Sequence, residues 1–349
     1  MLFDSQFAEQ RNFSDLHKII LQIRPGSIRE ELQRSTASLD TVDATGRSPL
    51  SWAAQRADAE VVEVLLEYGA DPNNNDRTNM TPLHYAAQAK TPECLLVLIE
   101  HGARITQQAR GWNALHSACA FRDNIDYIKP LLDRGIEINK RTYAGKSALS
   151  LAVLYNHTRS AAFLISVGAE LNVLDKEGLS PLALSIIFKN LESLKLLLQS
   201  GATHEITSEG GDTLLHLVAK FPDVEIINYL SGYSLGNVDP DARNKEHLTA
   251  RELMQIQNSD PNTALAFQKL LSRIAGTIDA NSGKSPDFDA QNVLFKHFVT
   301  EIFEDAVEQQ RVNPIPCVAP VGAISFHDPY GNPDCAASLG SLESRSEIV

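Results

Sequence analysis

A glycine that recurs every 33 residues constrains the fold of this chain more than any other feature of its sequence. The recurring residues are Gly69, Gly102, Gly135, Gly168 and Gly201. A fixed interval of this length indicates a repeated structural unit, and such units stack instead of closing around one core. An apolar run precedes each glycine, and glycine ends helices well because it adopts the left-handed conformation without a Cβ clash. The sequence therefore predicts a stack of helical units.

A second signature begins about twelve residues after each glycine and marks the start of another helix. A capping Thr, Asn or Ser precedes a first turn that is often opened by proline, as helix starts prefer. The helix that follows is short and rich in small residues, whereas the helix before each glycine is heavier. The signatures are Thr81-Pro82-Leu83-His84, Asn113-Ala114-Leu115-His116, Ser147-Ala148-Leu149-Ser150, Ser180-Pro181-Leu182-Ala183 and Thr213-Leu214-Leu215-His216.

These two signatures together resemble those of the ankyrin-repeat family, and the resemblance covers about two thirds of the chain. It implies an all-α fold with short β-hairpin-like fingers, an ankyrin-repeat α-solenoid of stacked helix-turn-helix units. It also implies protein–protein recognition through the concave face and the finger tips. The family serves many unrelated processes, so the partner stays open.

The repeat pattern and its loss divide the chain into five segments. We expect residues 1–42 to form a degenerate N-terminal capping repeat and residues 43–275 to form about six repeats plus a degenerate seventh. Residues 276–288 are expected to be a linker, residues 289–311 an amphipathic helix and residues 312–349 a disordered tail. The helix either docks on the last repeat or binds another protein, and both alternatives remain open.

Composition excludes several function classes. The net charge of −13 disfavours sequence-independent binding to nucleic acid or to an anionic membrane, and it weakly favours a basic partner. The four cysteines form no C-x-x-C pair, and neither a signal peptide nor a run long enough to cross a bilayer is present. We therefore expect an intracellular protein of the cytoplasm or nucleus.

Three histidines in one column of the repeats are the strongest candidates for chemistry. His84, His116 and His216 each stand three residues after the capping residue. In ankyrin repeats such a histidine resembles a structural residue that hydrogen-bonds at the junction of finger and helix. The chain also lacks phosphate-binding and nucleophile-elbow motifs in a suitable setting. We expect no catalysis, no metal and no cofactor.

An aromatic column is the first candidate for partner binding. Phe121, Tyr155, Phe188 and Phe221 stand at the end of the short helix in four consecutive repeats. Partly exposed aromatic side chains are common anchors of protein interfaces. The alternative is that each ring folds over its neighbour and seals the stack.

The fingers supply the second candidate. Met80, Trp112 and Leu179 stand one residue before the capping position and are larger and more apolar than a solvated finger requires. We interpret Trp112 as the best single finger anchor, with Tyr143 on a neighbouring finger tip.

The preferred function is non-catalytic recognition of another protein by an adaptor, scaffold or inhibitor. A targeting or regulatory subunit of an enzyme complex is the alternative, in which the helix within residues 289–311 binds the catalytic partner. A true enzyme is the third option.

Overall fold

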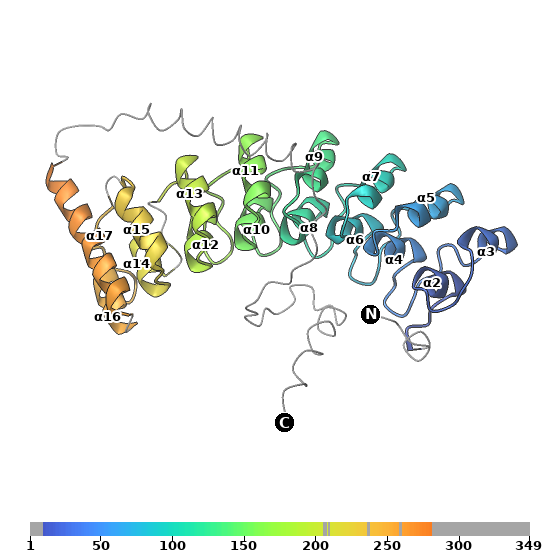
Figure 1. Ribbon diagram of the computed structural model, residues 1–349, viewed down its shortest axis with the longest axis horizontal. Coiled ribbons are helices and arrows are strands. Elements are labelled where there is room, and N and C mark those ends of the chain that lie inside the picture. Colours follow the sequence, from blue (N-terminus) through green and yellow to red (C-terminus); the bar gives the residue numbers. More distant parts are fainter. Residues whose placement is uncertain (1–9, 205–207, 209, 236–237, 258–259, 281–349) are drawn as a thin grey trace, which may run out of the picture. The chain divides into compact units, whose positions relative to one another are not determined.

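The computed structural model describes residues 10–204, 208, 210–235, 238–257 and 260–280, and all of them belong to one compact unit (Figure 1). Within them the chain forms helices joined two by two. The pairs are α2 (Asp15–Ile20) with α3 (Ile28–Arg34), α4 (Pro49–Gln55) with α5 (Ala59–Glu67), α6 (Pro82–Gln88) with α7 (Glu93–Glu100), α8 (Ala114–Phe121) with α9 (Ile125–Asp133), α10 (Ala148–Leu154) with α11 (Thr158–Ser166), α12 (Pro181–Ile187) with α13 (Leu191–Gln199), α14 (Leu214–Lys220) with α15 (Val224–Gly232), and α16 (Ala250–Ile256) with α17 (Pro261–Ala280).

The helices form two rows, which we call the first row and the second row. The first row contains the first helix of each pair, from α2 to α16, and each of its helices contacts the next one along the row (Figure 1). The second row contains the second helices, from α3 to α17. Small residues such as Ala53 and Ala86 are fully buried between neighbouring helices of the first row, so the helices pack closely. This is the solenoid of stacked helix-turn-helix units that the sequence predicts.

The periodic glycines end the second helices as expected. Gly69, Gly102, Gly135, Gly168 and Gly201 all have positive φ, between +83° and +93°. A side chain at these five positions would meet no atom within 4 Å. Their requirement for glycine therefore comes from backbone conformation alone.

The connections between pairs form fingers that are closed by their own backbone. In the finger at residues 142–146, the N–H of Thr142 donates to the carbonyl of Lys146 at 2.9 Å. Neighbouring fingers are also joined, because the N–H groups of Arg77, Lys176 and Lys245 donate to the preceding finger at 3.0–3.2 Å. These bonds hold successive finger tips side by side. Isolated bridges, and not strands, represent the β-hairpin character of the fingers in the described residues.

The contact between fingers predicts a large cost for a side chain at Gly145. A Cβ there would lie 2.9 Å from the backbone nitrogen of Lys176, at a φ of +80°. We expect Gly145→Ala to lower the free energy of unfolding by about 2–4 kcal/mol. Gly135→Ala is the matched control: it carries the same positive φ but meets nothing, so we expect about 1–2 kcal/mol. Urea denaturation measures both, and equal losses would contradict an effect of finger packing.

The structure corrects one boundary. Helix α17 continues to Ala280, so residues 276–280 are helical and the expectation of a linker is wrong for them. The apolar residues Phe267, Leu270 and Leu271 bury one face of α17 against the stack, and this packing supports a helix longer than the other second-row helices. The rest of the expected linker, the helix at 289–311 and the tail at 312–349 lie outside the described residues.

Candidate functional site

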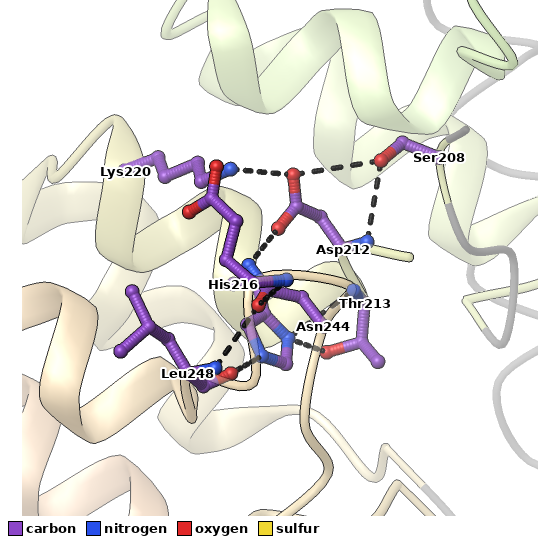
Figure 2. A network of polar contacts seen from close by, with 8 residues as sticks. Ser208, Asp212, Thr213, His216, Lys220, Asn244 and Leu248 are labelled. Atoms are coloured by element: carbon purple, nitrogen blue, oxygen red, sulfur yellow. Dashed lines mark hydrogen bonds and ion pairs between the residues drawn. The ribbon is translucent and has the colours of Figure 1, made fainter. Parts of the chain in front are cut away.

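The histidine column lies at the junction between each finger and the helix it precedes. In the four first helices that carry it, the backbone N–H of the capping residue donates to Nδ1 of the histidine at 3.1–3.2 Å. The other ring nitrogen lies 2.9–3.1 Å from a carbonyl of the following finger. Figure 2 shows His216 between Thr213 and the carbonyl of Leu248. The residues are His17, His84, His116 and His216.

These contacts fix the charge and tautomer of the rings. A carbonyl only accepts, so Nε2 must carry the proton, and Nδ1 must then be the acceptor of a neutral imidazole. Burial lowers the pKa of His17, His84 and His116 to about 4 in each case. Both nitrogens are used by backbone, which leaves none to bind a metal or move a proton. The prediction of a structural role for this column is confirmed.

Buried carboxylates organise the fingers in a similar way. Asp212 starts the last turn of its finger and accepts from Lys220 at 2.7 Å and from Asn244 at 2.9 Å (Figure 2). Burial alone would raise the pKa of Asp212, but these two bonds outweigh it and hold that pKa below its usual value. The carboxylate is therefore a structural anion, already paired inside the protein.

The cysteines within the described residues are equally unsuited to chemistry. Cys94 and Cys119 are buried free thiols. Burial raises the pKa of Cys94 to about 12 and that of Cys119 further still, so neither is a thiolate at neutral pH. Across the part of the chain that the structure describes, no group of three or more His, Cys, Asp or Glu is placed to hold a metal ion.

The aromatic column lies at the C-terminal ends of first-row helices, as the sequence predicts. Phe121, Tyr155 and Phe221 are 37–38% exposed, which is high for aromatic rings attached to a packed helix. Phe188 is more enclosed and packs against the hydrophobic core. Three of the four rings are therefore accessible at the surface, whereas Phe188 is partly buried, as the alternative of a ring that seals the stack predicts.

The finger anchors need correction. Met80 is only 6% exposed and Trp112 only 9%, so neither offers the accessible surface that an anchor needs. The position before the capping residue faces inward, over the first helix. Arg47 shows why: its guanidinium carbon lies 3.6 Å from the ring centre of Trp52 and 4.0 Å from that of Tyr85. Leu179 in the same column packs partly buried against the core.

Tyr143 is the accessible member of the finger set. It is 67% exposed, and it lies against the neighbouring finger at Gly111. A side chain at Gly111 would come within 2.6 Å of Tyr143, at a φ of +83°. The two fingers are thus brought together as expected, although Trp112 itself turns inward.

Charged finger tips are the feature that sequence reasoning missed. Arg77, Arg110, Lys176 and Lys245 are exposed at the tips, close to the places where successive fingers touch. Comparing charges at one finger position across repeats would have revealed them.

Comparison with known proteins agrees with this architecture. A family model described as ankyrin repeats (3 copies) matches residues 8–109, 50–142 and 105–175. The chain is also similar to the crystal structure of the human ASB11 ankyrin repeat domain, with 23% sequence identity and a TM-score of 0.56. That match covers 69% of this chain and 100% of the other. At such low identity it shows the fold alone. No curated protein matches the chain.

Proposed function

Because the chain belongs to the ankyrin-repeat family, whose members generally bind other proteins, we propose that it is a non-catalytic recognition protein that acts as an adaptor, scaffold or inhibitor. Its binding surface is the first row with its fingers. None of the described helices has both the length and the apolar character needed to cross a membrane. We place this activity in the cytoplasm or nucleus.

The observation that carries the proposal is the exposure of aromatic rings at neighbouring helix ends. Phe121 and Tyr155 come from consecutive pairs, and α8 contacts α10, so the two rings belong to adjacent units of one surface. Aromatic side chains supply large contact areas at small entropic cost, and they dominate the energetics of many interfaces. Tyr143 adds a third exposed ring at the finger side of the same row.

Replacing Phe121 and Tyr155 by serine is expected to release the partner. The matched control replaces Leu96 and Val224 by serine. These two residues are 38% and 40% exposed and lie on second-row helices. The tagged full chain is used to capture proteins from native extract, and mass spectrometry measures the amount of each. At least one captured protein should fall at least tenfold in amount with the first variant and remain unchanged with the second. Thermal denaturation of both variants monitors folding.

Two outcomes would contradict the proposal. Capture that depends on Leu96 and Val224 but not on Phe121 and Tyr155 would place the interface on the second row. Unchanged capture together with a large loss of thermal stability in the Phe121 and Tyr155 variant would support the alternative, in which these rings only seal the stack.

A further inference from the structure

Charge is segregated between the two rows of helices. No Asp or Glu occurs in the first-row helices α4, α6, α8, α10, α12 and α14. The second-row helices from α5 to α15 are acidic as a group, although α11 contains no acid, and their bases are only Lys129, Arg159 and Lys195. Their acids are Glu60, Glu63, Glu67, Glu93, Glu100, Asp126, Asp133, Glu192 and Glu225. The net charge of the whole chain therefore does not describe the charge of the first row.

Four acids close to the finger turns are buried, whereas the stretches that join the second-row helices to the fingers carry exposed acids, among them Asp71, Glu137 and Glu170. Asp43, Asp76, Asp175 and Asp212 are each at most 7% exposed. Asp76 illustrates the arrangement: one oxygen accepts from the N–H groups of Thr78 and Met80, and the other accepts from the hydroxyl of Tyr85 at 2.6 Å. Lys146 pairs with Asp175 and Lys220 pairs with Asp212, and burial keeps all four carboxylates from direct contact with a ligand at the surface.

Basic side chains remain exposed on both edges of the first row. On the finger edge, Arg77, Lys176 and Lys245 have no ion-pair partner among the described residues. Exposed acids accompany the later fingers, including Glu170, Glu177 and Glu246, whereas Glu137 is the exposed acid of the fingers between residues 77 and 146. The finger edge is therefore most positive over residues 77–146. On the aromatic edge Arg56, Lys90 and Lys189 are exposed, whereas Arg122 is half-buried and donates to the carbonyl of Gln88.

The dimensions of this surface fit an extended chain. The first-row helices from α4 to α16 are seven or eight residues long, so the two edges lie about 10 Å apart at 1.5 Å per residue. Packed helices are spaced about 8–10 Å apart, which sets the distance between successive rings of the aromatic column. An extended polypeptide advances about 3 Å per residue, and in the polyproline II conformation every third side chain returns to the same side. One apolar side chain in three would therefore meet successive rings.

We propose that the first row binds an extended acidic polypeptide segment that carries an apolar side chain at about every third residue. The apolar side chains contact Phe121, Tyr155 and Phe188, and the intervening carboxylates pair with the basic residues of both edges. The inference rests on the proposed function and adds the chemistry of the partner. It replaces the basic partner that the net charge favoured.

Synthetic peptides of twelve residues test the proposal with the full chain. The acidic probe repeats Asp-Glu-Leu four times, an isomer of the same composition groups its four leucines together, and the basic probe repeats Lys-Lys-Leu. Fluorescence anisotropy should show the acidic probe binding at least tenfold tighter than the basic probe and at least threefold tighter than the isomer. Its affinity should fall as salt rises from 50 to 200 mM, because exposed charges are screened.

Charge-reversed variants locate the site. Arg77→Glu with Lys176→Glu should weaken the acidic probe about fivefold to thirtyfold, whereas Lys129→Glu with Lys269→Glu should change it less than twofold. The control makes the same change in net charge at exposed positions on α9 and α17. Equal weakening by both variants would show a general charge effect and would overturn the proposal.

The remaining outcomes separate the inference from the function beneath it. Tighter binding of the basic probe, or of a twelve-nucleotide single-stranded RNA, would overturn the acidic partner. If the acidic probe fails while protein capture still depends on Phe121 and Tyr155, only the chemistry of the partner is wrong. If capture is also independent of those two residues, the function fails with it.

Discussion

Lowering the pH from 7.5 to 4.5 is expected to remove several kcal/mol from the free energy of unfolding. His17, His84 and His116 have a pKa of about 4 in the folded protein, below the ordinary value of 6.5. These three histidines therefore become protonated below pH 6.5 in the unfolded chain, but only near pH 4 in the folded protein. Stability from these rings is fully present above pH 6.5 and is lost progressively across that window, by about 2–3 kcal/mol for each ring at pH 4.5.

Urea denaturation at several pH values measures this dependence, and His84→Ser supplies the matched variant. Serine fills the same column at Ser51 and Ser150, where its backbone N–H is capped by the residue three positions earlier. The variant should be less stable at pH 7.5, because the carbonyl of Trp112 loses one of its two donors and keeps only the N–H of Ala109. It should also lose about one third less stability on acidification. An unchanged slope would mean that His84 does not titrate as described. Because the window stops at pH 4.5, the carboxylates contribute little.

Removing the carboxylate of Asp76 should be as damaging as placing a side chain at Gly145. Asp76→Ala leaves the N–H of Met80 and the hydroxyl of Tyr85 without their acceptor inside the protein, and we expect a loss of about 2–4 kcal/mol. Tyr85 is itself buried and lies against the guanidinium of Arg47, so water cannot easily replace the lost acceptor.

Asp76→Asn is the control that the chain itself suggests. Asn244 occupies the same place in the last finger, and its Oδ1 accepts from the N–H groups of Glu246 and Leu248. Asparagine at 76 keeps this acceptor, so we expect it to lose less than about 1 kcal/mol. Denaturant midpoints of the two variants decide the matter. Equal losses would show that the charge, and not the finger turn, stabilises this position.

The fold could be predicted from the sequence because its strongest signals are local. Gly69 and its counterparts end helices through their own φ, and His84 caps the helix on which it stands. Burial of finger side chains depends instead on residues about thirty positions away. Met80 and Trp112 look exposed in a polar stretch, but both are buried in the folded protein. Arg47 shows the same dependence, since one of its two rings belongs to the next pair of helices.

The charge of the candidate surface could not be predicted from the net charge of the chain, again because burial depends on the fold. Net charge sums all side chains equally, although Asp43 and Asp76 are buried in hydrogen bonds and Arg77 is exposed beside them. Composition cannot distinguish a buried acid from an exposed base, because the folding of each finger decides which of its charged side chains reach the surface. Sorting the charges by helix row would have recovered part of the signal.

The histidine bonds give the array a direction. Each ring reaches from its own unit to the finger that follows, but in α16 the same position holds Glu252, which accepts from Thr249 and Arg243 within its own unit. Glutamate caps its helix but has no proton to donate to the carbonyl of a following finger. The series of hydrogen bonds between units therefore ends at α16. A unit duplicated in the interior, after α9 for example, would inherit the bond from His116, whereas one grafted beyond α17 would begin without it. Such an array grows by insertion more readily than by elongation.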